Sequence, residues 1–168
     1  MIQSKPKTWE ISLKKQLKFP LNEIWDVISS KNNLELFHPF CKTNKIIYWC
    51  GVNSSDLLIY LNGRSYTRTF LSWHKNKGYT LTIGSNKSKL SYVEWSLYNE
   101  YGKNYIKISI YPYLLKKIPR FISYIPYKLY IIPKLKSYLS SVLNGLDFYM
   151  NNNKKISKNQ FGKHSWFS

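Results

Sequence analysis

Several residue types are scarce or missing in this sequence of 168 residues, which has two cysteines, eight acidic residues and no alanine. Cys41 and Cys50 have no Cys-x-x-Cys or histidine cluster around them, which excludes a disulfide framework and a zinc site of the usual spacing. No run approaches the roughly 18 apolar residues of a membrane-spanning helix. The start of the chain shows no signal peptide. We therefore expect a cytoplasmic protein with reduced thiols and without a metal or other cofactor.

The shortage of acids leaves a formal net charge of +18. Such a charge favours nucleic acid or anionic lipid as a partner, because Lys and Arg bind phosphate groups. Only three of the 26 basic residues are arginine, however, while Lys, Asn, Ile and Tyr are abundant. An AT-rich coding bias explains this composition equally well. Residues 101–146 carry eight basic side chains and no acidic one, so the positive field is strongest there.

The first 40 residues predict one strand and two short helices. A strand through Ile11 and Leu17 ends at Pro20, because proline cannot continue a strand ladder. Apolar residues at positions i, i+3, i+4 and i+7 predict a helix over 21–28. A second helix over 33–37 is closed by the residue before a proline, His38, which avoids helical geometry.

The middle of the chain predicts an antiparallel sheet with one apolar and one solvated face. Its short β-rich runs alternate apolar and polar residues and are separated by turn residues. Asn62-Gly63 predicts a tight hairpin with a two-residue type I′ turn, since both residue types tolerate positive φ. The predicted strands lie near 45–49, 57–61, 64–73, 79–84, 90–98 and 105–111.

The last third predicts a long helix over Lys134–Met150, the longest periodic segment, which would cover the apolar face of the sheet. Gly145 within it indicates either a close approach by the sheet or a ligand, or simply a tolerated glycine. The predicted domain is 8–150. Residues 151–168 form a polar linker and a tail with three aromatic residues in its last ten, and we expect that tail to dock on the domain.

This order of elements resembles the helix-grip fold of the START-like or SRPBCC superfamily, which includes polyketide cyclases and lipid-transfer proteins. The resemblance is carried by Phe19–Trp25, Leu36–Phe40, Tyr60–Tyr66 and the final helix. It implies an α+β fold in which a curved antiparallel sheet of about seven strands wraps around the helix. It also implies a cavity for an apolar ligand, here expected to exceed about 300 Å³. A Pro/Tyr/Lys-rich insertion at 112–133 and the tail exceed that pattern.

Candidate cavity residues follow from the predicted inward faces, although aromatic residues at such spacing are more often plain core. His38 is the best-placed of three histidines. Arg68 either points outward as a surface charge, which we favour, or points inward to hold an acidic group or to pair with Glu94. The predicted ligand-binding residues are Trp25, Phe37, His38, Phe40, Tyr60, Tyr66, Arg68, Phe70, Leu81, Trp95, Leu139 and Leu143.

No catalytic motif is present, so no catalytic residue is assigned. We expect a carrier or sensor of an apolar small molecule such as a lipid, quinone, isoprenoid or polyketide-like compound. The alternative is a cyclase- or dehydratase-like enzyme in which His38, Arg68 and Glu94 converge in the cavity. Nucleic acid is not an expected partner, because the aromatic residues occupy apolar-face positions rather than an exposed stacking platform.

The insertion at 112–133 supports two interpretations. Aromatic residues interleaved with basic ones suit the surface of an anionic membrane, whereas a lid packed over the cavity would bury the same aromatics. Its prolines exclude one continuous helix across the segment. The predicted membrane contacts are Lys116, Lys117, Arg120, Phe121, Tyr124 and Lys128.

Overall fold

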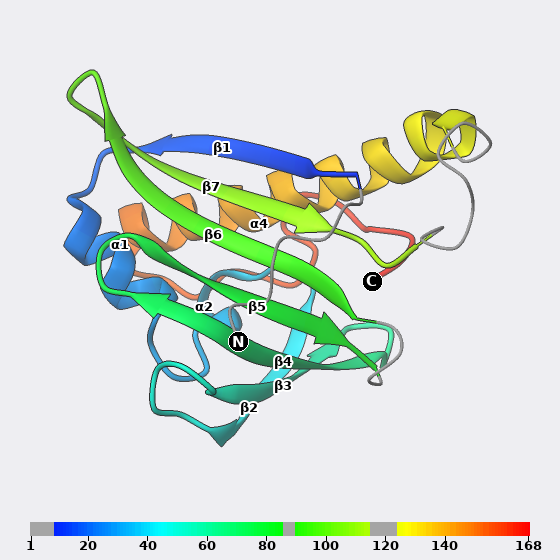
Figure 1. Ribbon diagram of the computed structural model, residues 1–168, viewed down its shortest axis with the longest axis horizontal. Helices are drawn as coiled ribbons and strands as arrows, with labels where there is room; N and C mark the ends of the chain where they lie inside the picture. The colour runs from blue at the N-terminus through cyan, green and yellow to red at the C-terminus, as the bar shows by residue number, and fades with distance from the viewer. Residues whose placement is uncertain (1–8, 86–89, 115–123) are drawn as a thin grey trace.

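The computed structural model describes residues 9–85, 90–114 and 124–168. Its seven strands form one antiparallel sheet in the order β1-β7-β6-β5-β4-β3-β2. The sheet curves around the long helix α4 (Ile132–Asn152), which Figure 1 shows running along its concave side. This is the helix-grip arrangement, and it confirms the predicted α+β fold class. The strands are β1 (Ile11–Leu17), β2 (Cys41–Tyr48), β3 (Ser55–Tyr60), β4 (Ser65–His74), β5 (Gly78–Gly84), β6 (Ser91–Glu100) and β7 (Lys103–Tyr111).

Alternating burial explains why each strand forms where it does. Along β3 the residues alternate between buried and half-buried, and along β7 Ile106 and Ile108 are buried while Lys107 between them is not. Successive strand residues point to opposite faces, so one face of the sheet meets the helix. Each predicted strand occurs, but β2 begins at Cys41, four residues earlier than expected.

The β3–β4 hairpin occurs as predicted, but its turn type is not the predicted one. Gly63 has a φ of +85°, but the φ of Asn62 is not positive. A type I′ turn needs positive φ at both residues, so the prediction of this turn type is wrong. Instead the Gly63 N–H donates to the Tyr60 carbonyl at 3.0 Å, and the Tyr60 N–H donates to the Arg64 carbonyl at 2.8 Å. This three-residue loop has its glycine in the left-handed position. The longer loop moves the strand register by one residue.

Helices α1 (Leu21–Ile28) and α2 (Leu34–Phe37) occupy the predicted positions after β1. The final helical segment begins earlier than expected, because the backbone is helical from Tyr124 and passes through a π-helical stretch, η1 (Tyr127–Ile131). Pro133 follows directly after this stretch. Proline lacks the N–H that an α-helical turn would use, and the wider π turn accommodates that loss. The final helical segment is therefore longer than the predicted Lys134–Met150, because it also includes the residues from Tyr124 onward.

The core lies between the sheet and α4, and Gly145 decides how close α2 comes. A Cβ atom on Gly145 would lie 1.9 Å from the carbonyl oxygen of Phe37. The close approach that this glycine indicated is therefore made by α2, not by the sheet or a ligand. Around it the buried residues of α4 include Leu139, Leu143 and Leu146.

The C-terminal residues pack against the domain, as the three aromatics predicted. The Ile156 N–H donates to the Leu36 carbonyl at 2.9 Å, and the Asn159 N–H donates to the Pro39 carbonyl at 3.0 Å. His164 Nε2 lies 3.0 Å from the carbonyl oxygen of Lys134 in α4. The end of the chain is thereby held beside the N-terminal part of α4, where Figure 1 places it.

Candidate functional site

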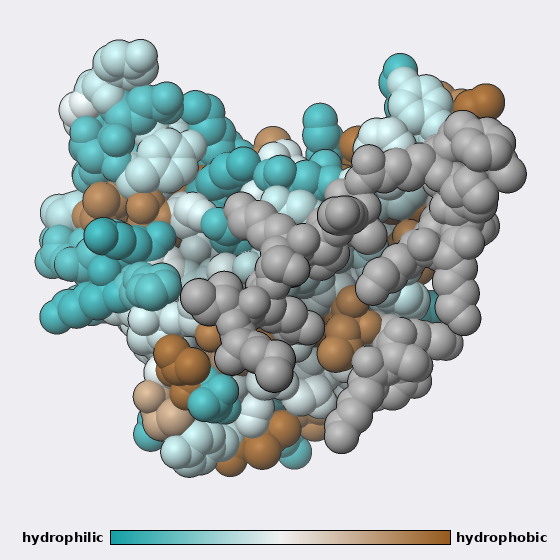
Figure 2. Space-filling model, viewed as in Figure 1, coloured by the Kyte–Doolittle hydropathy of each residue, from teal (hydrophilic) through white to brown (hydrophobic). Residues whose placement is uncertain are grey.

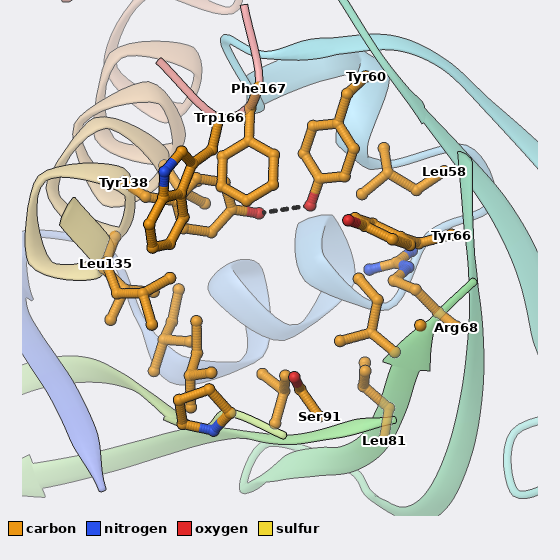
Figure 3. Close-up of a pocket in the computed structure, with 18 of the residues that line it drawn as sticks. Leu58, Tyr60, Tyr66, Arg68, Leu81, Ser91, Leu135, Tyr138, Trp166 and Phe167 are labelled. Atoms are coloured by element: carbon orange, nitrogen blue, oxygen red, sulfur yellow. Dashed lines mark hydrogen bonds between the residues drawn. The ribbon is translucent and has the colours of Figure 1, made fainter. Parts of the chain in front are cut away.

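A pocket of about 310 Å³ lies between α4 and the sheet. Its wall comes from five places: strands β3 to β7, residues 112–114 after β7, the N-terminal half of α4, the α2 region and the C-terminal tail. Figure 3 shows side chains from these elements facing a common space. Most of the lining is aliphatic or aromatic, including Leu34, Leu58, Leu81, Ile83, Val93, Ile108, Ile110, Leu114, Leu135, Leu139 and Val142.

Seven of the twelve predicted ligand-binding residues line this pocket: His38, Tyr60, Tyr66, Arg68, Leu81, Trp95 and Leu139. The other five lie in the core outside it: Trp25, Phe37, Phe40, Phe70 and Leu143. These five residues are buried, as their apolar side chains predicted. The sequence pattern does not distinguish an apolar residue that packs in the core from one that lines a cavity.

The ring contacts of the four aromatic residues among these five explain their positions. Trp25 packs edge-on against Trp73 with ring centroids 5.4 Å apart, and Phe70 packs against Trp73 at 5.1 Å. Phe37 in α2 lies against Trp95, and Phe40 stacks on Tyr138. Because Trp95 and Tyr138 line the pocket, Phe37 and Phe40 lie behind its wall, whereas Trp25 and Phe70 pack in the core around Trp73.

Three polar side chains meet at one side of the pocket. His38 Nε2 lies 2.8 Å from the Tyr138 hydroxyl oxygen, which lies 3.0 Å from the hydroxyl oxygen of Tyr60. Figure 3 shows the hydroxyl groups of Tyr60 and Tyr138 side by side with that of Tyr66 near them, while Leu81 lies across the pocket. The polar group therefore faces a mainly apolar side, where the Ser91 hydroxyl accepts the Tyr113 N–H at 3.2 Å.

Burial makes this polar group electrically neutral. Removal from water, together with the nearby positive charge of Arg68, lowers the pKa of His38 to about 3, so its imidazole is uncharged at neutral pH. Burial also raises the pKa of Tyr138 to about 12 and raises that of Tyr60 well above its usual value. Both tyrosines therefore keep their protons and act as hydrogen-bond donors or acceptors.

Arg68 points inward, so the favoured surface interpretation is wrong, and its partner is Asp56 rather than Glu94. Arg68 Nε donates to Asp56 Oδ1 at 2.8 Å, and Nη2 donates to Oδ2 at 2.5 Å. Both residues are buried, and they face each other directly across β3 and β4. Burial lowers the pKa of Arg68, but the attraction and hydrogen bonds of Asp56 outweigh that effect and raise it overall. The pair is a closed, neutral unit in the wall of the pocket.

The proposed convergence of His38, Arg68 and Glu94 does not occur. Val93 and Trp95 line the pocket, so Glu94 between them points to the opposite face of the sheet. It accepts a hydrogen bond from Ser96 there at 3.4 Å. Across the described residues, no group of three or more His, Cys, Asp or Glu side chains is placed to hold a metal ion.

The C-terminal tail and one tyrosine of α4 contribute to the site without having been predicted there. Trp166 and Phe167 line the pocket, and Phe167 stacks on Tyr60 with ring centroids 4.4 Å apart. Tyr138, on the apolar stripe of the predicted helix, completes the polar group. The aromatic content of the tail was the only signal in the sequence, and it indicated docking without indicating where.

The predicted membrane segment is described only in part, because Lys116, Lys117, Arg120 and Phe121 lie outside the described residues. Tyr124 is partly exposed and packs against Trp9, and Lys128 Nζ lies 3.1 Å from its hydroxyl oxygen. None of the helices described is long and apolar enough to span a membrane.

No protein-family model and no curated protein matches the sequence, whereas many solved structures match the fold. DynU16 from the dynemicin biosynthetic locus superposes with a TM-score of 0.65 at 11% identity over 87% of this chain, which spans 48% of DynU16. Protein MLL2253 from Mesorhizobium loti superposes with a TM-score of 0.64 at 11% identity, over 87% of this chain and 99% of the MLL2253 chain. Ara h 8.0201 superposes with a TM-score of 0.62 at 13% identity, over 86% of this chain and 99% of Ara h 8.0201. The resemblance to the START-like superfamily is confirmed at the level of the fold.

Proposed function

We propose that this chain binds a small, largely apolar molecule in the pocket between α4 and the sheet, as a carrier or sensor rather than as an enzyme. The observation that carries the proposal is the pocket of about 310 Å³ with its mainly apolar wall. A cavity of this size suits a small molecule, and apolar walls with a few convergent polar groups are typical of ligand sites. START-like proteins of similar fold mostly bind apolar ligands in the equivalent space.

The enzyme alternative loses its main support, because Glu94 lies on the opposite face of the sheet from His38. Arg68 is committed to Asp56, and the pKa of His38 is too low for a proton acceptor at neutral pH. The polar groups of the pocket therefore favour holding a ligand over transferring protons.

The test is to fill the pocket from α4 and measure uptake of the neutral fluorescent probe N-phenyl-1-naphthylamine. Leu139 lines the pocket, and Ser137 lies on the exposed face of the same helix. We expect Leu139→Trp to weaken probe binding by about tenfold or more, because the larger ring occupies the space. Ser137→Trp, the matched control, should bind the probe as the native chain does. Equal probe binding by both variants and the native chain would contradict the proposal.

A second part of the proposal concerns the surface beside the pocket. Ile125, Leu129 and Tyr130 are 63%, 72% and 55% exposed. Figure 2 shows hydrophobic side chains at the right-hand edge of the molecule, beside the first turns of the final helical segment. Lys128 and Lys134 lie among them, and the segment 124–146 contains no acidic residue. Apolar side chains surrounded by lysine match the chemistry of an anionic membrane surface. The proposed role of this surface is reversible contact with anionic lipid.

A further inference from the structure

The hydrogen bonding of His38 fixes which of its nitrogens carries the proton. The backbone N–H of Phe40 donates to His38 Nδ1 at 3.2 Å, so Nδ1 must present a lone pair. In the neutral imidazole the proton is then on Nε2. It follows that Nε2–H donates to the Tyr138 hydroxyl oxygen, 2.8 Å away.

Counting hydrogens shows that this group has one donor to spare. His38 Nε2, Tyr138 and Tyr60 together carry three donor hydrogens, and the two contacts between them use one hydrogen each. One phenolic hydrogen remains whichever way the bond between the tyrosines runs. Across the described residues neither hydroxyl is bonded to any further acceptor, and both side chains line the pocket. The spare O–H therefore faces the ligand space.

The side chains packed around this donor carry no net charge. Arg64 also lines the pocket, but it is exposed to solvent and its Nη1 donates to the Trp166 carbonyl at 3.4 Å. Arg68 is neutralised by both carboxylate oxygens of Asp56, and the buried imidazole of His38 is neutral. A carboxylate at the Tyr60 and Tyr138 hydroxyl groups would be desolvated, and the buried Arg68 beside them is already paired with Asp56, so its burial is costly. A neutral oxygen would instead satisfy the spare donor, which otherwise stays unpaired in an empty pocket.

From this geometry we infer that the pocket selects molecules that carry a neutral acceptor oxygen, such as a ketone or quinone carbonyl, on an apolar frame. The oxygen accepts the spare hydrogen of the Tyr60–Tyr138 pair, and the frame lies against the aliphatic wall around Leu81 and Leu135. This inference rests on the proposed function and adds the ligand class to it.

Three naphthalenes of similar shape test the inference: 2-acetylnaphthalene, 2-ethylnaphthalene and 2-naphthoate, each competing with N-phenyl-1-naphthylamine. A single Tyr→Phe change still leaves one donor, because the remaining tyrosine keeps its hydrogen. Removing both tyrosine hydroxyls would still leave the His38 Nε2–H, which would lose its acceptor and which also lines the pocket. The informative variant is therefore His38→Leu/Tyr60→Phe/Tyr138→Phe. We expect it to bind the ketone about two- to tenfold more weakly and the hydrocarbon unchanged. Tyr127→Phe removes another buried hydroxyl outside this pocket and serves as the control.

Equal effects of the triple variant on ketone and hydrocarbon would overturn the inference, as would binding of 2-naphthoate to the native chain as tightly as the ketone. Both outcomes leave the proposed function standing, since displacement of the probe shows an occupied pocket. Failure of the probe itself to bind would instead overturn the proposed function. To cover a triple variant that does not fold, the carbonyl stretch of ¹³C-labelled 2-acetylnaphthalene is also measured in the native protein. A frequency lowered from its value in hydrocarbon solvent supports the inference, and an unshifted frequency overturns it.

Discussion

The two halves of α4 are built for different purposes. In the C-terminal half, Gly145 lets the backbone of α2 approach so closely that a single methyl group would collide with the Phe37 carbonyl oxygen. In the N-terminal half, Leu135, Tyr138 and Leu139 face a pocket instead of a partner backbone. One helix thus serves as a packed support at its C-terminal end and as a pocket wall at its N-terminal end. We call these the closed half and the open half of α4. A ligand site of this kind depends on a rigid neighbour that keeps the space from collapsing.

The largest expected effect comes from breaking the closed half. Gly145→Ala removes a poor helix former but puts a Cβ atom 1.9 Å from the Phe37 carbonyl oxygen. We expect the clash to prevail and the free energy of unfolding to fall by about 3 kcal/mol, measured by urea denaturation. Ser137→Ala, on the exposed face of the open half, should change stability by less than about 0.5 kcal/mol. A Gly145→Ala chain as stable as the native one would show that α2 and α4 are not tightly packed.

The next effect comes from protonating His38, which joins α2 to Tyr138 in the open half. The pKa of His38 is lowered from 6.5 to about 3 in the folded chain, so the unfolded chain binds the proton more readily. The stability that it contributes is complete above about pH 6.5 and is lost as the pH falls toward 3. Between pH 7 and pH 5 we expect a loss of about 2 kcal/mol.

The check is urea denaturation of the native chain and of His38→Gln at both pH values. The variant lacks the titrating group and should lose correspondingly less stability on acidification. His164, whose pKa is also lowered mainly by burial, contributes in the same direction in both proteins and cancels from the difference. Identical pH dependence in the two proteins would mean that His38 is not held neutral.

The smallest effect concerns the exposed surface at the beginning of the open half. Replacing Ile125 and Leu129 by serine should weaken binding to vesicles of phosphatidylserine and phosphatidylcholine by about tenfold, because two apolar side chains no longer enter the interface. Cosedimentation measures the change. Ile47→Ser/Val52→Ser removes two exposed apolar side chains elsewhere and keeps the same net charge. If both double variants bind equally well, the vesicles attract the overall charge and not this surface.

Much of the fold could be predicted because its signals are local. Helical spacing located α1 and the body of α4, and alternation located the strands. The aromatic tail was expected to dock because its side chains would otherwise be exposed to water. These predictions depend only on neighbouring residues and on the need to bury apolar surface.

The site was harder to predict because it depends on register and depth. With the expected two-residue turn at Asn62-Gly63, Asp56 would face Thr69, whereas the observed three-residue loop places it opposite Arg68. One residue of turn length thus decided whether the charge of Arg68 was balanced by a carboxylate. Leu139 and Leu143 likewise look equivalent in the sequence, although only Leu139 lines the pocket.

By itself the sequence determined the element order, the apolar faces and the strong positive charge, since each is written in residue type and spacing. Only the tertiary structure decided which apolar residues surround a space and which fill one. It also brought together His38 from the C-terminal end of α2, Tyr60 from β3 and Tyr138 from α4, across as many as 100 residues of chain. Hydrogen bonds of this kind depend on positions in three dimensions within about 3 Å, and no local pattern of residues encodes that precision.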